Sequence, residues 1–283
     1  MEAQYVIGVE VQKLIMKNQI GHLLFWTATL FALAAKAQVV PLTRVHAHND
    51  YEHKRPLRDA LDHGFCSIEA DIYLVDGQLL VAHDRSQVRL ERTLQALYLN
   101  PLRERIKQNG GRVYPTGPEV VLLIDLKSDW REIYPPLRKV LHDYQDMLVT
   151  FHDGIRETNA ILAIITGNRS KSMFNGESVR YAALDGELAD LESGISSDLI
   201  PWISSNWYQT FQWRGTGETP ADQKAKLKDI VQKAHQHGRK VRFWGSPDQP
   251  VFWKELLADN VDLINTDHLE GAQRFLLESG ILH

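Results

Sequence analysis

Short apolar runs alternate with helical patterns along most of this 283-residue chain, and this alternation limits the fold more than any other feature. Nine runs have the composition of buried strands: 42–48, 66–74, 119–127, 146–152, 160–167, 179–186, 199–207, 240–246 and 261–267. Helical patterns lie between many of them, at 56–64, 92–108, 130–143, 221–237, 251–259 and 268–278. Nearly continuous apolar runs are typical of parallel strands covered on both faces. The repeated units predict an α/β fold, a (β/α)8 TIM barrel, with a doubly wound sheet as the second choice.

Nine candidate strands are one more than such a barrel needs. The runs 146–152 and 160–167 follow each other closely, so we expect either that they form a hairpin or that one of them lies outside the barrel. No linker, low-complexity tract or internal repeat separates a second domain. Residues 38–283 are therefore predicted to fold as a single domain.

The N-terminal segment has the pattern of an export signal. Residues 21–38 are apolar for about a dozen positions and end in Ala35-Lys36-Ala37, a small-x-small pattern that precedes signal cleavage. The run is shorter than the roughly 20 residues needed to span a bilayer. We assign 1–37 to a signal peptide, with Met16 as an alternative start. This signal predicts secretion or a location in a bacterial periplasm or cell envelope. The lone cysteine, Cys66, excludes an internal disulfide, and an exported protein without disulfides fits a bacterial envelope better than a eukaryotic secretory route.

Two carboxylates share one face of a buried strand. Glu69 and Asp71 lie two residues apart in the run 66–74, and like charges on an apolar face are costly unless a cation lies between them. Asp125 ends a neighbouring run, and barrel strands bring their C-terminal ends to one rim. Three carboxylates suit Mg²⁺ or Ca²⁺, whereas Zn²⁺ prefers nitrogen and sulfur ligands. The sequence therefore predicts a divalent metal site.

Imidazoles reach the same rim. His46 and His48 end the first run, and an Asp-Gly turn at 76–77 returns the chain so that His83 follows the second. The ordinary pKa of imidazole is close to neutral pH, so histidine can act as a general acid or base. We expect His48 and His83 to form an acid–base pair, and Lys127 to neutralise charge on phosphate oxygens.

These motifs resemble those of a known superfamily. The pattern AHND, then GFCSIEADIYLVDGQLLVAHD, then LLIDLK is similar to the phospholipase C-like phosphodiesterases. That group includes glycerophosphodiester phosphodiesterases, sphingomyelinase D enzymes and phosphatidylinositol-specific phospholipase C. The later segments FWGSPDQP and VDLINTDH extend the resemblance over residues 43–275. The closest form is an uncharacterised HSHNDY subgroup of secreted bacterial and fungal members.

The resemblance implies a metal-dependent phosphoric diester hydrolase on a TIM barrel. By this resemblance the catalytic pair is His48 and His83, and the metal ligands are Glu69, Asp71 and Asp125. His48 is preferred to His46 because AHND overlays the family's AHRG. His46 is expected one layer deeper, where it supports the site or replaces His48 in the same role.

The motif after the first run departs from the family pattern. His-Arg-Gly is replaced by His48-Asn49-Asp50, so the family's arginine is missing and we expect Asn49 and Lys127 on the phosphate side. Trp244 is expected either to form a wall of the substrate pocket or to be a buried packing residue. The attacking group is either a substrate hydroxyl, which gives a cyclic phosphate, or water.

The expected substrate is a small-molecule or lipid phosphodiester, such as a glycerophosphodiester or a phospholipid headgroup, with transient contact to a membrane surface. The net charge of -4 does not indicate a nucleic-acid partner, and nothing implies a protein partner.

Two other functions are compatible with parts of the sequence. His-x-His also opens the barrels of amidohydrolase-type metal hydrolases, in which His152 and Asp267 could be ligands. That alternative leaves Glu69, Asp71 and His83 without a role. A non-catalytic barrel that binds phosphate-bearing ligands would hold a metal without turnover.

Overall fold

The computed structural model describes residues 39–281, and the elements below belong to the compact unit that begins at Val40. The segment 1–37, for which the sequence predicts a signal peptide, lies outside the described residues. Within 39–281 we find no helix with the length and apolar character that crossing a membrane requires.

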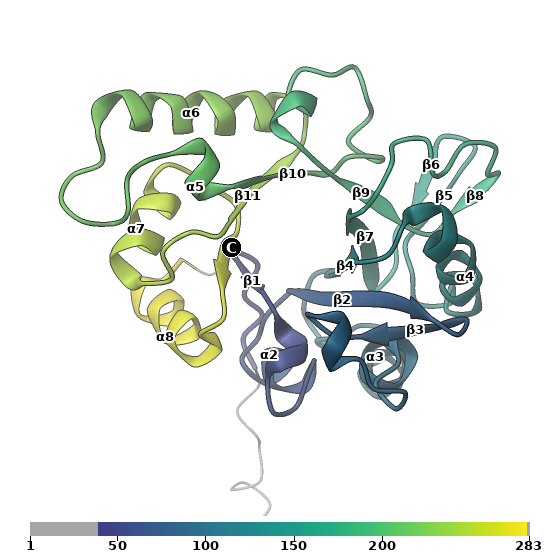
Figure 1. Ribbon diagram of the computed structural model, residues 1–283. Coiled ribbons are helices and arrows are strands. Elements are labelled where there is room, and N and C mark those ends of the chain that lie inside the picture. Colours follow the sequence, from purple (N-terminus) through teal and green to yellow (C-terminus); the bar gives the residue numbers. More distant parts are fainter. Residues whose placement is uncertain (1–38, 282–283) are drawn as a thin grey trace, which may run out of the picture. The chain divides into compact units, whose positions relative to one another are not determined.

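Eight parallel strands form the barrel (Figure 1): β1 (Val45–Ala47), β2 (Ser67–Val75), β4 (Val120–Leu126), β7 (Ile161–Gly167), β9 (Ala183–Gly186), β10 (Trp202–Asn206), β11 (Lys240–Trp244) and β12 (Ile264–Thr266). They follow one another around the ring in chain order, and β12 pairs with β1. A parallel bridge between Arg242 and Leu263 joins the remaining two edges. The predicted TIM barrel is thus confirmed, and the doubly wound sheet is not formed.

Helices lie outside the ring of strands in Figure 1. They are α2 (Arg58–Asp62), α3 (Asn100–Gln108), α4 (Trp130–Asp143), α5 (Trp207–Thr210), α6 (Ala221–Gln236), α7 (Pro250–Ala258) and α8 (Leu269–Ser279). A π-helical turn, η3 (Gln95–Leu99), precedes α3, and three 3-10 turns are η1 (Asp50–Glu52), η2 (Arg85–Gln87) and η4 (Leu188–Asp190). The local sequence explains α4: the Asp129 side chain accepts the Arg131 N–H at its start, and Ile133, Leu137 and Leu141 recur every four residues on its buried face.

The ninth predicted strand lies outside the barrel. β5 (Thr150–His152), β6 (Ile155–Glu157) and β8 (Val179–Arg180) form a separate antiparallel sheet. The expected hairpin between the runs 146–152 and 160–167 is wrong, because β5 turns back at 153–154 and pairs with β6 instead. The predicted strand 179–186 is also two strands, since its first residues pair with β5 and its last join the barrel as β9.

An antiparallel strand, β3 (Gln78–Val81), extends β2 at the C-terminal rim of the barrel. The turn between them contains Asp76 and Gly77, both with positive φ, of 48° and 76°. Such turns match the natural twist of a two-residue hairpin. The return strand leads directly to His83 beside β2.

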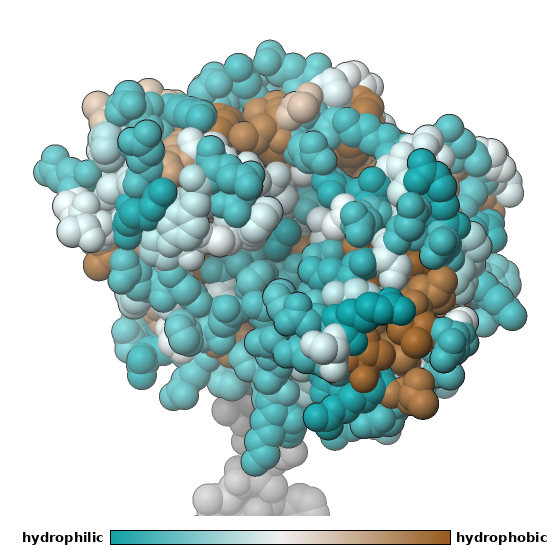
Figure 2. Space-filling view, in the orientation of Figure 1, coloured by the Kyte–Doolittle hydropathy of each residue, from teal (hydrophilic) through white to brown (hydrophobic). Residues whose placement is uncertain are grey.

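The inward-facing residues change from apolar to polar along the strands. Leu123, Ile164, Ala183 and Trp202 belong to a buried cluster in the barrel interior. Two residues later, on the same face of the same strands, come Asp125, Thr166, Asp185 and Ser204. The lower layers therefore fill the barrel, and the upper layer forms the polar floor of a cleft. Hydrophilic residues predominate in the middle of the face shown in Figure 2.

Candidate active site

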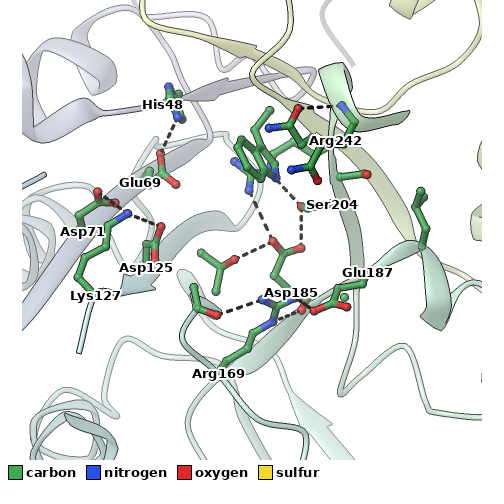
Figure 3. Close-up of a pocket in the computed structure, with 18 of the residues that line it drawn as sticks. His48, Glu69, Asp71, Asp125, Lys127, Arg169, Asp185, Glu187, Ser204 and Arg242 are labelled. Carbon is green, nitrogen blue, oxygen red and sulfur yellow. Dashed lines mark hydrogen bonds and ion pairs between the residues drawn. The ribbon is translucent and has the colours of Figure 1, made fainter. Parts of the chain in front are cut away.

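A cleft of about 650 Å³ opens at the C-terminal ends of the barrel strands (Figure 3). One wall comes from β1, β2 and β4 and carries His48, the acidic residues and Lys127. The opposite wall comes from β9, β10 and β11 and carries Asp185, Ser204 and Arg242. The polar residues expected from separate strand ends thus meet in one cavity.

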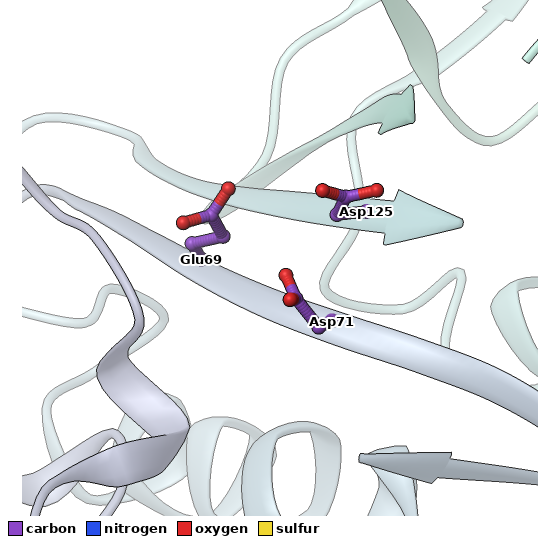
Figure 4. A group of neighbouring side chains, drawn as sticks. All are labelled: Glu69, Asp71 and Asp125. Atoms are coloured by element: carbon purple, nitrogen blue, oxygen red, sulfur yellow. The ribbon is translucent and has the colours of Figure 1, made fainter. Parts of the chain in front are cut away.

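Glu69, Asp71 and Asp125 form an acidic cluster on two adjacent strands (Figure 4). The register of β2 and β4 places Asp71 beside Asp125, and Glu69 points to the same face two residues earlier. Each residue offers one carboxylate oxygen, and these three oxygens lie within 4.8 Å of one another. This spacing allows all three to contact one cation.

The surroundings of Asp125 fit a cation ligand. Its Oδ1 atom is buried and has no hydrogen-bond partner among the described residues, although a buried carboxylate oxygen normally needs one. Gly167, with φ of 73°, lies against it: a Cβ atom there would be 1.9 Å from Asp125 Oδ1. The absence of a side chain at 167 is therefore required for the position of this carboxylate.

Lys127 partly balances the acidic cluster. Its Nζ atom lies 2.8 Å from Asp125 Oδ2 and 2.9 Å from Asp71 Oδ2. Burial on its own lowers the pKa of Lys127, but the charges of Asp125 and Asp71 have a larger effect in the opposite direction. The net pKa of Lys127 is therefore raised, and the amine stays protonated. Burial, together with the charges of Glu69 and Asp125, raises the pKa of Asp71 to about 7. One lysine is thus too little positive charge for three carboxylates.

His48 is held by a carboxylate that follows the last barrel strand. Its Nδ1 lies 2.8 Å from Asp267 Oδ1, and its Nε2 lies 3.8 Å from Glu69 Oε2. Burial on its own lowers the pKa of His48, but the hydrogen bond to Asp267 and the charge of Glu69 outweigh this effect. The net pKa is raised, which favours the imidazolium form.

His83 lies on the other side of the acidic cluster and is about half exposed, at 48% of its side chain. Its Nδ1 lies 3.0 Å from the Tyr51 hydroxyl and 3.4 Å from Asp71 Oδ2. The two histidines therefore flank the carboxylates, each with Nδ1 facing a side-chain partner.

The residues that follow β1 support this arrangement. Asn49 has a left-handed backbone, φ 49°, which directs its N–H to Glu69 Oε2 at 3.2 Å. Its side-chain amide lies near His48, Asp267 and Tyr51 rather than projecting freely into the cleft. Asp50 is fully buried and accepts hydrogen bonds from the Leu57 N–H and the Tyr98 hydroxyl. Asn49 and Tyr51 thus make hydrogen bonds to both histidines of the site and to the carboxylates of Glu69 and Asp71.

His46 lies in the barrel interior and does not line the cleft. Its Nδ1 is 2.6 Å from Ser67 Oγ, and its Nε2 is 4.0 Å from Glu69 Oε2. Burial, Arg242 and His48 all lower the pKa of His46, so the ring is neutral. Trp244 ends β11, is 40% exposed and lines the cleft, so it is not a buried packing residue.

The opposite wall contains a buried ion pair that sequence reasoning missed. Arg242 Nη2 lies 3.5 Å from Asp185 Oδ2, and the oxygens of Asp185 also accept from Thr166 and Ser204. Arg242 supplies a guanidinium group to this wall of the cleft, from β11 and not from the segment after β1 where the family pattern has its arginine. The only sequence signal was its place in the run 240–246, two residues before Trp244.

Tyr51, Gly167 and Asp267 were also missed as parts of this site. The sequence suggests Asp267 only as a ligand in the amidohydrolase alternative, and Tyr51 directly follows the His-Asn-Asp motif. His152, the other ligand of that alternative, lies in β5 and pairs with Glu157 at 3.1 Å, outside the cleft. That metal site is therefore not formed.

Comparison with models of known families gives a match. Residues 34–184 match the model of the AIM6-like phosphodiesterase domain. A protein of Arthroderma benhamiae named altered inheritance of mitochondria protein 6 homolog is 28% identical over 269 residues, which cover 84% of each chain. Altered inheritance of mitochondria protein 6 of Saccharomyces cerevisiae is 30% identical over 275 residues, covering 80% of this chain and 68% of the yeast protein.

Among solved structures, a glycerophosphodiester phosphodiesterase from Parabacteroides distasonis aligns with 86% of this chain and 98% of its own, at 13% identity and a TM-score of 0.48. A glycerophosphodiester phosphodiesterase from Agrobacterium tumefaciens aligns with 84% of this chain and 99% of its own, at 16% identity and a TM-score of 0.44.

The relatives correct the predicted location. Secretion or a bacterial periplasm or envelope was expected, but the curated relatives are proteins of yeasts and other fungi whose names refer to the inheritance of mitochondria. The prediction was wrong because it relied on a short apolar run and on a single cysteine. Both features also occur in proteins that are not exported by bacteria.

Proposed function

This chain belongs to the family of AIM6-like phosphodiesterase domains, and from that premise we propose that it is a metal-dependent phosphoric diester hydrolase. The observation that carries the proposal is the cluster of three carboxylates on β2 and β4, flanked by two imidazoles in one cleft. The orphaned oxygen of Asp125 and the incomplete charge balance by Lys127 support a cation as the missing partner.

Glu69, Asp71 and Asp125 would hold the cation. All three donors are oxygens, which favours Mg²⁺ or Ca²⁺ over Zn²⁺. When bound, such an ion polarises a phosphoryl oxygen and offsets the negative charge that develops on the phosphate.

His48 and His83 would transfer the protons. Because Asp267 favours the imidazolium form of His48, His48 is suited to protonate the leaving alkoxide. His83 would accept the proton of the attacking water or substrate hydroxyl. Lys127 adds a positive charge beside the phosphate, and the buried Arg242 adds another on the cleft floor.

The far half of the cleft favours a polar alcohol group in the substrate. Its lining includes Arg169, Glu187, Ser205, Asn206 and Gln209, with Trp244 as the one large exposed aromatic residue in the lining. We therefore propose a small phosphodiester or a lipid headgroup, such as a glycerophosphodiester, as the substrate.

A phosphodiester panel tests the function. Glycerophosphodiesters, phospholipids and bis(p-nitrophenyl) phosphate would be incubated with the protein in Mg²⁺, Ca²⁺ or EDTA, and ³¹P NMR would separate cyclic from linear products. We expect turnover that EDTA abolishes and added metal restores. The Asp71→Asn variant, purified in parallel, controls for a contaminating hydrolase. Hydrolysis of esters or amides without any phosphodiester turnover would refute the proposal.

A further inference from the structure

The hydroxyl of Tyr51 lies within hydrogen-bond distance of three polar side chains. It lies 2.7 Å from Asp71 Oδ2, 2.6 Å from Asn49 Oδ1 and 3.0 Å from His83 Nδ1. The side chain is buried at 3% exposure, and its ring is nearly parallel to that of His83, at 18° and 6.3 Å between centroids. Arg92 donates a hydrogen bond to the Tyr51 carbonyl at 2.6 Å, which fixes the backbone of the same residue.

The number of protons that the Tyr51 hydroxyl can donate determines the direction of these hydrogen bonds. A phenol has one proton to donate and can accept at its oxygen. Two of the three neighbours of Tyr51 are oxygen acceptors, and a carboxylate is a stronger acceptor than a neutral ring nitrogen. The ordinary pKa of a tyrosine phenol is about 10, so near neutral pH the phenol keeps its proton and donates it to one of these oxygens. His83 Nδ1 must then carry a proton and donate it to the phenol oxygen.

We propose that Tyr51 is a positioning residue that fixes His83 in the Nδ1–H tautomer and leaves its Nε2 atom unprotonated for proton transfer. The tautomer follows from the hydrogen bonds alone, whereas its consequence for turnover rests on the proposed function. Asp71 Oδ2 could also accept from His83 Nδ1, but at 3.4 Å it is farther away and already contacts Lys127 at 2.9 Å. The hydroxyl of Tyr51 is therefore the main acceptor.

The Tyr51→Phe variant tests this assignment. It keeps the ring that lies against His83 and removes only the hydroxyl. Tyr73→Phe is the matched control, because the Tyr73 hydroxyl donates its hydrogen bond to the backbone carbonyl of His83, at 3.1 Å, and not to a ring nitrogen. ¹⁵N NMR of the full chain with labelled histidine, at a pH where imidazole is neutral, reports the tautomer directly. His83→Gln identifies the His83 signals.

We expect the Nδ1–H tautomer in the unmodified protein and in Tyr73→Phe, and a substantial Nε2–H population in Tyr51→Phe. On an active phosphodiester, kcat of Tyr51→Phe should fall by roughly 10–100-fold, as for other residues that orient a functional histidine, with a smaller change in KM. Unchanged kcat of Tyr73→Phe would show that a lost tyrosine hydroxyl near His83 is not by itself harmful.

An unchanged tautomer in Tyr51→Phe would overturn the proposal, even if the variant were less stable. If the tautomer changes but no phosphodiester is hydrolysed by any form, the positioning role stands and the proposed function fails. If Tyr51→Phe does not fold, a fluorotyrosine at position 51 keeps the hydroxyl and weakens it as an acceptor. The Nδ1–H proton resonance of His83 should then move to lower frequency, and its constancy would also overturn the assignment.

Discussion

His48 and Asp267 are 219 positions apart in the chain, and yet His48 Nδ1 lies 2.8 Å from Asp267 Oδ1. The contact forms because β12 closes the barrel against β1 and brings the two strand ends together. It also sets the charge of His48, since the raised pKa depends on this hydrogen bond.

Replacing Asp267 with Asn should lower the pKa of His48, measured by NMR titration of the His48 ring proton. The raised pKa stabilises the folded state fully below the ordinary histidine value of about 6.5, and this contribution is lost as pH rises through the raised value. The stability deficit of Asp267→Asn should therefore be larger at pH 6 than at pH 9. Asp262→Asn is the control, because Asp262 pairs with His235 outside the cleft at 2.8 Å. Equal deficits at both pH values would contradict the prediction.

The contribution of Asp71 to the stability of the metal-free protein should fall as pH rises from 4 to 7. Burial and the neighbouring carboxylates raise the pKa of Asp71 to about 7, so the folded state keeps a proton that the unfolded state has released in this range. Added Mg²⁺ or Ca²⁺ should therefore raise Tm more at pH 8 than at pH 5. Asp71→Asn should lose most of the metal-induced shift. A shift of the same size in both proteins would remove Asp71 from the ligand set.

Gly167→Ala should weaken metal binding, because the new Cβ atom would lie 1.9 Å from Asp125 Oδ1 and 2.7 Å from the Leu126 carbonyl oxygen. Gly154→Ala is a matched control: Gly154 also has positive φ, 75°, but a Cβ atom added there would have no neighbouring atom within 4 Å. Both variants should lose about 1–2 kcal/mol from backbone strain. Calorimetric titration with metal should show reduced affinity for Gly167→Ala alone, and equal affinities would contradict the steric explanation.

His48→Ala and His83→Ala should each lower turnover of bis(p-nitrophenyl) phosphate by roughly 10²–10⁴-fold, the usual contribution of a general acid or base. The double variant should lose less than the product of the two effects, because the residues act together in one reaction. His142→Ala, an exposed histidine on α4, should retain normal turnover. Near-normal hydrolysis by His83→Ala would exclude the paired-histidine mechanism.

The strands of the barrel and the acidic residues at its rim could be predicted because the patterns that indicate them are local in the sequence. The buried run around Glu69 and Asp71 defines one strand, and its two-residue period defines a shared face without reference to any neighbour. The Asp76-Gly77 turn likewise places His83 near these carboxylates by local geometry alone.

The remaining parts of the site depend on contacts that a linear pattern does not contain. Asp267 meets His48 only when the ring closes, and Gly167 matters only because Asp125 lies against it on the next strand. The run 146–152 looked like a barrel strand because it is apolar, but its last three residues pair in the small outer sheet. Apolar composition predicts burial, and it does not identify the partner strand.

Closure of the barrel by its last strand affects how the protein is made. A nascent chain that has left the ribosome as far as β11 still lacks β12, so the edges of β1 and β11 have no strand between them. Unpaired strand edges are prone to aggregate, so the chain is open to edge-to-edge pairing with other chains until β12 is in place. Since β12 is followed directly by Asp267, the same step of translation protects the edges and gives His48 its carboxylate partner.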